Sequence, residues 1–167
     1  MVALSRLFPK YQFIVTAVKW IERSHYDRYI GDSDVKYICD RTQQTLDVAD
    51  AAIVTSGTAT LETALMGIPE VVLYHVPWLY EKLKPYFLRI PYISLVNINL
   101  QRECVKELVR AKLDMAEAER EIRAILPNGE KRERLLQEFD ELRNMLGEVG
   151  ASDRFAADMI KSLKSKK

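Results

Sequence analysis

The feature that most constrains the fold is an alternation of short apolar runs with helical patterns over the first hundred residues. Parallel strands covered on both faces have such runs, and crossover helices join them. We therefore predict a doubly wound α/β fold with a mostly parallel sheet. The expected strands are 13–18, 35–39, 51–55, 71–74 and 92–96, and the expected helices lie near 20–30, 41–49, 58–66 and 78–89.

Beyond Asn97 the pattern becomes helical. Segments 103–110, 114–126, 130–146 and 152–164 have apolar residues at three- and four-residue spacing. Within 130–146 one apolar stripe is formed by Leu135, Leu136, Phe139, Leu142 and Leu146. We predict a sheet-bearing core over 1–110 and a helical carboxyl-terminal extension over 111–167.

Composition excludes several classes of function. The formal net charge is +1, from 25 basic and 24 acidic side chains, whereas a nucleic-acid surface is normally strongly basic. Cys39 and Cys104 lie far apart and His25 and His75 are the two histidines, so we expect reduced thiols and no metal site. No apolar run approaches the ~20 residues that a membrane span needs. We expect a cytoplasmic location.

One loop carries the pattern of a binding site. Ser56, Gly57 and Thr58 join a predicted buried strand to a predicted helix, and Glu62 lies one turn into that helix. Ligands settle at such strand ends, where helix N–H groups attract phosphate and glycine permits close approach. A carboxylate there suits the hydroxyl donors of a ribose. The alternative is that Glu62 complements the helix dipole while Ser56 or Thr58 caps the helix.

The helix itself is predicted to have two faces. Leu61, Ala64, Leu65 and Ile68 are expected to face the core. The residues Thr58, Glu62 and Met66, spaced by four, are then expected to share a more accessible face.

Several motifs together resemble the lipid-A-disaccharide synthase family. These are Ala49 to Glu62, Gly67-Ile-Pro69, Pro91 to Asn97, Arg102-Glu103 and Val105 to Leu108. Members of that family are glycosyltransferases of the two-domain GT-B type, and the chain is similar to their carboxyl-terminal, nucleotide-binding half. The resemblance implies a Rossmann-like core that binds the UDP-sugar.

The resemblance also implies a reaction and roles for residues. The family moves 2,3-diacylglucosamine from UDP to 2,3-diacylglucosamine 1-phosphate with inversion, in lipid A biosynthesis, and no metal or other cofactor is expected. Ser56, Gly57 and Thr58 would contact the diphosphate and Glu62 the ribose. Asn97 and Arg102 would line the cleft and contact the donor or the acceptor phosphate.

Two departures from the family pattern bear on activity. The chain has Gln101 where the family usually has a glycine before Arg102, and its start resembles the helix after the family's Gly-Ser-Arg loop. The family's first strand and its acceptor-binding domain, with the expected general base, would then be absent. We expect the chain alone to be inactive unless an amino-terminal domain is supplied. A stand-alone nucleotide- or phosphate-binding module and a truncated, inactive product remain alternatives, and an unpaired sheet edge would favour self-association.

The stretch 76–92 is rich in aromatic and basic residues. Such a mixture suits a membrane interface, where the acylated substrates would lie. We expect peripheral association with the inner face of the cytoplasmic membrane; the alternative is that the rings pack against another part of the protein. The candidate membrane-facing residues are Trp78, Tyr80, Lys82, Lys84, Phe87 and Arg89.

Overall fold

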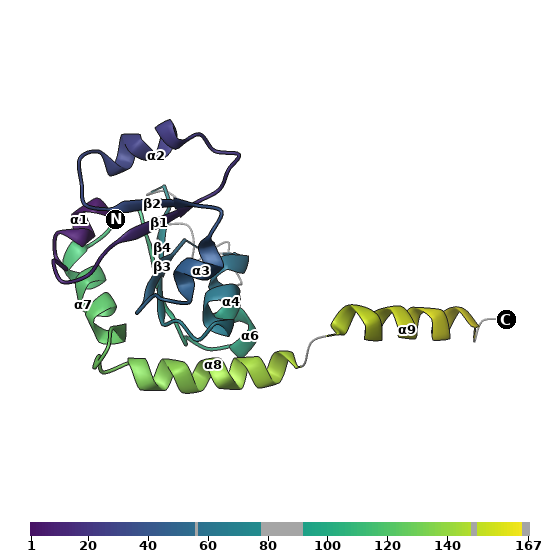
Figure 1. Cartoon of the computed structure of the whole chain (residues 1–167). Helices are drawn as coiled ribbons and strands as arrows, with labels where there is room; N and C mark the ends of the chain where they lie inside the picture. The colour runs from purple at the N-terminus through teal and green to yellow at the C-terminus, as the bar shows by residue number, and fades with distance from the viewer. Residues whose placement is uncertain (56, 78–91, 148–149, 165–167) are drawn as a thin grey trace.

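The structure is a computed structural model that describes residues 1–55, 57–77, 92–147 and 150–164. Figure 1 shows helices packed around two groups of strands. The strands are β1 (Ile14–Ala17), β2 (Lys36–Cys39), β3 (Ala52–Val54), β4 (Glu70–His75) and β5 (Lys106–Arg110). The helices are α1 (Val2–Ser5), α2 (Arg23–Ile30), α3 (Thr42–Leu46), α4 (Thr58–Leu65), α6 (Leu95–Leu100), α7 (Met115–Ile125), α8 (Arg132–Leu146) and α9 (Ala151–Lys164).

The strand pairs described are all parallel, which confirms the predicted α/β class. β1 pairs with β2, with Ile14 opposite Lys36. Separately, β3, β4 and β5 form a sheet in that order, with Val71 of β4 opposite both Ile53 and Lys106. The β1–β2 pair crosses the direction of β3 and β4 in Figure 1. The described strands therefore form two sheets rather than one continuous sheet.

The prediction is wrong at the last strand. The segment 92–96 is not a strand: Ser94 forms an isolated bridge with Gly57, and α6 begins at Leu95. The last strand is instead β5, within the segment 103–110 that was predicted to be helical.

Side-chain hydrogen bonds explain why 92–96 does not form a strand. The Ser94 hydroxyl accepts from the Asn97 N–H at 3.2 Å and caps α6. The Glu107 carboxylate on β5 accepts the N–H groups of Ile93 and Ser94 at 2.9 and 3.0 Å. The amides that a strand at 92–96 would use are thus bound by a side chain of β5.

The predicted helices of the carboxyl-terminal part are present as α7, α8 and α9. Asp114 caps α7 by accepting from the N–H groups of Ala116 and Glu117. On α8 the expected apolar stripe is buried at Leu135, Phe139 and Leu142 and ends before Leu146, which is 41% exposed. Helices α7 and α8 share a core with β4, β5 and α6.

Two arginines fasten α8 to the segment that contains β3 and α4. Arg132 donates to the Asp50 carbonyl, just before β3, at 2.6 Å. Arg143 donates to the Leu65 carbonyl, at the end of α4, at 2.9 Å. Helix α8 is therefore bonded to both ends of the strand, loop and helix that carry the predicted binding site.

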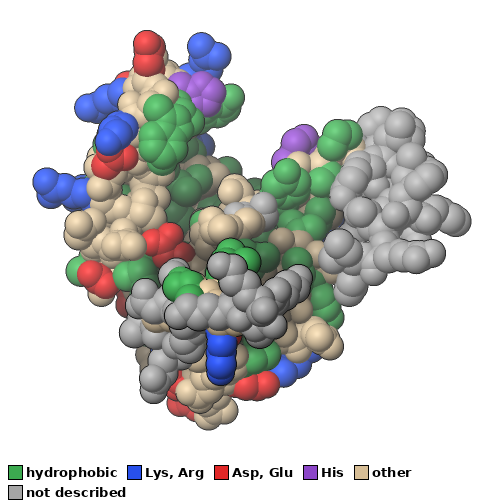
Figure 2. Space-filling model, turned by 90° about the vertical axis from the view of Figure 1, so that its right-hand side faces the viewer, with side chains coloured by type: hydrophobic (Ala, Val, Ile, Leu, Met, Phe, Trp, Pro, Cys, Tyr) green, Lys and Arg blue, Asp and Glu red, His purple; other side chains and the backbone are tan. Residues whose placement is uncertain are grey.

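A cavity of about 530 Å³ lies between β1 and β3. Its walls include Ile14, Val15 and Thr16 of β1 and residues 51–55 around β3. Figure 2, turned by 90° from Figure 1, shows the surface hollowed between the lobe that carries α2 and the rest of the molecule. The two sheets thus differ in strand direction, and a cavity lies between them.

Helix α9 lies beyond the body of the molecule in Figure 1. Its apolar residues Phe155, Met159, Ile160 and Leu163 are each more than half exposed. In the part of the chain that the structure describes, no helix combines the length and apolar character needed to cross a membrane.

Candidate functional site

The loop between β3 and α4 has the backbone geometry that the sequence predicted for a site of close approach. Gly57, at the start of α4, has φ 76° and ψ −151°, a conformation that side chains with a Cβ rarely adopt. Gly57 and Thr58 are exposed, and no side chain among the described residues caps α4. Ser56 lies outside the described residues. The start of α4 is therefore exposed at residues 57–59 and has no side-chain cap among the described residues.

The start of α4 lies beside the start of α6. Gly57 forms a bridge with Ser94, and the Leu95 N–H donates to the Thr60 hydroxyl at 3.2 Å. The same hydroxyl donates to the Gly57 carbonyl at 2.8 Å. Thr60 thus joins the two helix starts, so the position of Gly57 depends on contacts from both.

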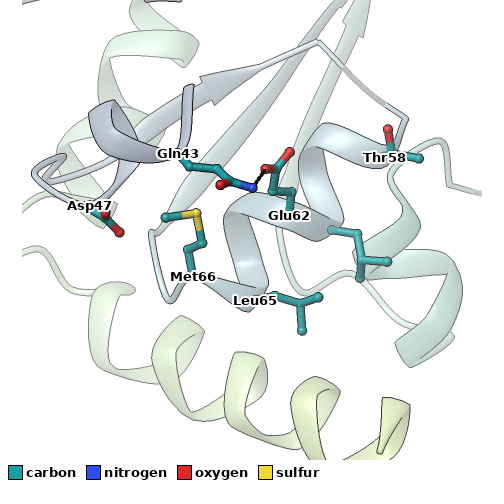
Figure 3. A pocket seen from close by; sticks show the side chains of 7 residues that line it. Gln43, Asp47, Thr58, Glu62, Leu65 and Met66 are labelled. Carbon is teal, nitrogen blue, oxygen red and sulfur yellow. Dashed lines mark hydrogen bonds between the residues drawn. The ribbon is translucent and has the colours of Figure 1, made fainter. Parts of the chain in front are cut away.

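Glu62 lies on the wall of a cavity of about 540 Å³ between α3 and α4. Its Oε1 accepts from Nε2 of Gln43 on α3 at 3.0 Å, as the dashed line in Figure 3 shows. Figure 3 also shows Thr58 at the start of α4, so a hydroxyl and a carboxylate from one helix border the same cavity. The other lining residues are Asp47, Leu61, Leu65 and Met66.

Sequence reasoning did not identify Gln43 and Asp47. They are spaced by four within the segment 41–49, which was predicted to be helical, so both can face the same neighbour. That spacing is the signal that could have identified them. The identity of the neighbour depends on how α3 packs against α4, which no local pattern specifies.

The prediction for the faces of α4 is right for one face and only partly right for the other. Thr58, Glu62 and Met66 do share the cavity wall. Leu61 and Leu65 line that cavity too, and Leu65 is 37% exposed. The buried residues of α4 are Ala64, as predicted, and the two threonines Thr60 and Thr63, which were not. The two threonine hydroxyls donate to carbonyls of their own helix, so these side chains can be buried without unpaired polar groups.

Asn97 is fully buried, and its side chain is bonded within the chain. Its Oδ1 accepts the N–H groups of Cys104 and Val105 at 2.8 and 2.9 Å. Its Nδ2 donates to the Val105 carbonyl and to Glu107 at 2.9 and 2.8 Å. Asn97 therefore holds the turn that leads from α6 to β5.

Arg102 lies on the side of that turn facing α8. It pairs with Glu141 and lies 4.0 Å from Glu138, both on α8. The side-chain hydrogen bond to Glu141 raises the pKa of Arg102 and lowers that of Glu141. Gln101, where the family resemblance leads one to expect a glycine, has φ 54° and ends α6 in a left-handed conformation. The chain thus keeps the backbone shape that a glycine would favour there.

Comparisons with known proteins identify the family. The family model for lipid-A-disaccharide synthetase matches residues 2–158. The chain is 32% identical over 155 residues to a lipid-A-disaccharide synthase from Anaeromyxobacter dehalogenans, covering 91% of this chain and 40% of that protein. This chain belongs to the lipid-A-disaccharide synthase family. The lipid-A-disaccharide synthase of Myxococcus xanthus is 32% identical, over 96% of this chain and 42% of that protein. The synthase of Syntrophus aciditrophicus is 33% identical, over 92% of this chain and 41% of that protein.

The chain spans about two-fifths of the length of these synthases. It corresponds to the carboxyl-terminal half of the family. Among the residues implied by the synthase resemblance, Gly57, Thr58 and Glu62 come from one loop and helix, whereas Arg102 faces α8 and Asn97 is enclosed. The membrane-facing candidates Trp78, Tyr80, Lys82, Lys84, Phe87 and Arg89 lie outside the described residues.

The described residues hold no group of three or more His, Cys, Asp or Glu side chains that could bind a metal ion. The thiols of Cys39 and Cys104 are free. Cys104 is buried, and that burial raises the pKa of its thiol, so it packs as a small apolar residue.

Proposed function

We propose that this chain is the UDP-sugar-binding half of a lipid-A-disaccharide synthase, a GT-B glycosyltransferase that joins two acylated glucosamine units in lipid A biosynthesis. The observation that carries the proposal is the arrangement at α4, where Gly57 and a helix start with no side-chain cap among the described residues lie one helical turn from Glu62. Helix N–H groups suit a diphosphate, and a carboxylate suits ribose hydroxyls.

Gln43 supports this assignment of Glu62. By donating to Oε1, the Gln43 amide holds the carboxylate along the wall of the cavity, and within the described residues no hydrogen bond reaches Oε2. A held carboxylate with a free oxygen loses less side-chain entropy when it accepts from a ligand. In this proposal Thr58 and Ser56 contact the diphosphate, Glu62 accepts from the ribose, and Gln43 positions Glu62.

Calorimetric titration of the chain with UDP tests the proposal. We expect UDP to bind, and Glu62→Gln to weaken binding about tenfold, because the charged acceptor is lost while its shape is kept. Glu133→Gln is the matched control, since Glu133 is exposed on α8, away from the cavity. Uridine, UMP and inorganic phosphate, titrated in parallel, separate the ribose contact from the phosphate contact.

Two outcomes would contradict the proposal. If UDP gave no binding heat, the nucleotide site would be excluded. If the isolated chain joined both acylated sugars, the division into a donor half and an acceptor half would be wrong, because the proposal places the acceptor site and general base in the rest of the synthase. UDP binding without transfer also describes a stand-alone nucleotide-binding module, so addition of the amino-terminal half must then restore transfer.

We also propose that the chain acts at the inner face of the cytoplasmic membrane. The support is the composition of 78–89, the segment between β4 and α6, which contains four aromatic and three basic residues. Flotation with anionic liposomes should show binding that is reduced by Trp78→Ala combined with Lys82→Ala, because rings insert at the headgroups and cations meet lipid phosphate.

The matched control for flotation is Lys19→Ala combined with Trp20→Ala. Lys19 and Trp20 carry the same chemistry and are 78% and 76% exposed. If both double variants lost binding equally, or if neither did, the contact would not be specific to 78–89.

A further inference from the structure

The buried threonine at position 60 links the loop before α4 to the start of α6. Thr60 is fully buried, and its hydroxyl donates to the Gly57 carbonyl at 2.8 Å. The same hydroxyl accepts the Leu95 N–H at 3.2 Å. Because a backbone N–H can only donate, the bond from Leu95 leaves the hydroxyl proton of Thr60 directed to Gly57. The start of α6 therefore determines which way this hydroxyl points.

The bond to Gly57 fixes the orientation of one peptide group. The Gly57 carbonyl also accepts the Thr60 N–H, at 3.3 Å, so both bonds hold this carbonyl toward α4. The peptide between Gly57 and Thr58 is trans, and in a planar trans peptide the C=O and the N–H point in opposite directions. The Thr58 N–H is therefore directed away from Thr60, at a place where Gly57 and Thr58 are exposed.

The orientation of this peptide group matters for an anion. Without the hydroxyl, only the longer bond from the Thr60 N–H would hold the Gly57 carbonyl. Gly57 has no Cβ, so the backbone conformations that a flipped peptide needs are open to it. In the flipped orientation a carbonyl oxygen would replace the N–H at the exposed surface, and its negative partial charge repels an anion. The hydroxyl thus favours the orientation that attracts a phosphate.

The start of α6 is itself anchored to β5. The Glu107 carboxylate accepts the N–H groups of Ile93 and Ser94 at 2.9 and 3.0 Å and the Ser94 hydroxyl at 2.8 Å. Those two residues directly precede Leu95, so Glu107 sets the place of the Leu95 N–H. A series of contacts therefore runs from β5 through the start of α6 to Gly57.

We infer that Thr60 is a positioning residue for nucleotide binding: its buried hydroxyl keeps the Gly57–Thr58 peptide turned so that the N–H, and not the carbonyl, faces the diphosphate. The inference rests on the proposed function, because it takes UDP as the ligand. Thr60 is fully buried, so it acts through the peptide group rather than by touching the nucleotide. The contact between Glu62 and the ribose does not depend on this hydroxyl.

Titration of the whole chain with UDP, followed by NMR, tests the inference. Thr60→Val keeps the shape of the side chain and removes the hydroxyl, so we expect the Kd for UDP to rise about tenfold. The affinity for uridine, which has no phosphate, should stay unchanged. Thr60→Ser restores the hydroxyl and should bind UDP as the unsubstituted chain does. The amide signals of Thr58 and Leu95 should shift in Thr60→Val more than in Thr60→Ser.

Thr63→Val is the matched control. Thr63 lies on the same helix, is 3% exposed, and makes one described hydrogen bond, from its hydroxyl to the Ala59 carbonyl at 2.8 Å. Its loss should leave the affinity for UDP unchanged, and urea unfolding checks that both valine variants are folded at the temperature of the titration. A similar loss of UDP affinity in Thr63→Val, or an equal loss for uridine and UDP in Thr60→Val, would overturn the inference.

The same titrations separate the inference from the proposed function. If UDP binds equally well to the unsubstituted chain and to Thr60→Val, the proposed function stands and the inference is overturned. If Thr60→Ser binds UDP as weakly as Thr60→Val, the hydroxyl is not what positions the peptide, and the inference is overturned again. If UDP does not bind the unsubstituted chain, both the proposed function and the inference are overturned.

Discussion

Glu70 is a buried carboxyl whose surroundings favour its neutral form. It is the first residue of β4, is fully buried, and neither carboxyl oxygen has a hydrogen-bond partner among the described residues. Burial raises its pKa to about 9, from an unperturbed value of 4.5. The folded protein therefore keeps a proton on Glu70 at pH values where the unfolded chain has lost it.

This difference predicts a pH-dependent stability. Because the folded state binds the proton more tightly, the free energy of unfolding falls as the pH rises from about 4.5 to about 9. Glu70→Gln should flatten that dependence, and Glu70→Met should raise the free energy of unfolding at pH 7 by about 3 kcal/mol. Urea unfolding measured from pH 5 to pH 9 gives both values.

Glu133→Gln on the exposed face of α8 serves as the control for Glu70, and it should leave the pH dependence unchanged. If Glu70→Gln and the unsubstituted chain show the same slope against pH, then Glu70 ionises in the folded state without cost and its described environment is wrong.

Substitution of Asn97 tests whether its side chain has a structural role or contacts a ligand. Asn97→Ala removes the acceptor for the amides of Cys104 and Val105, so we expect a loss of about 3 kcal/mol in urea unfolding. Asn99→Ala is the matched control, because that side chain makes one described hydrogen bond, to the Leu95 carbonyl. If Asn97→Ala weakened UDP binding at unchanged stability, the role implied by the family resemblance would hold instead.

At the scale of elements, the start of α4 depends on one backbone conformation. Gly57→Ala adds a Cβ that meets no atom within 4 Å, so its effect comes from the positive φ rather than from a clash. We expect a loss of about 1 kcal/mol in stability and a larger relative loss of UDP affinity, because the strained loop moves the first N–H groups of the helix.

Gly31→Ala is a matched control for Gly57. Gly31 ends α2 with φ 53° and ψ −141°, and its added Cβ would also meet open space. The two substitutions should cost similar stability while Gly57→Ala alone weakens UDP binding. Equal losses of affinity would place the nucleotide elsewhere.

The elements that could be predicted from sequence are those whose local pattern and tertiary contacts agree. The apolar runs that became β1 to β4 were predicted from their local pattern, although the residues of β1, β2 and β3 are mostly half-buried. β5 was not predicted because it begins with two charged residues, Lys106 and Glu107, which do not fit the pattern of an apolar strand. The Glu107 carboxylate accepts the N–H groups of Ile93 and Ser94. That long-range contact also explains why 92–96 is not a strand, and no window of local sequence contains it.

In the candidate site, too, some features follow from local sequence and others from long-range contacts. Gly57, Thr58 and Glu62 lie within six residues, so their proximity follows from the chain itself. Gln43 reaches Glu62 through the packing of α3 on α4, and Arg102 turns to Glu141 because α8 lies there. Contacts of that kind depend on the whole arrangement of helices and could not be derived from spacing.

At the scale of the whole molecule, the two sheets differ in how they are held. β3, β4 and β5 share the core with α6, α7 and α8, whereas β1 and β2 pair with each other and β1 borders the cavity between β1 and β3. The buried residues concentrate on the first group, and α2 has none. We therefore expect the β1–β2 part to open at lower free energy than the rest.

The two arginines of α8 tie the thermal stability of the loop that contains Gly57 to the docking of α8. Arg132 and Arg143 bond the two ends of the strand and helix that flank Gly57, so the loop keeps its shape for as long as α8 stays docked. On heating, release of α8 frees both ends together. On heating, we expect the affinity for a ligand at α4 to be lost in the same transition as the docking of α8. The β1–β2 pair should unfold in a separate transition.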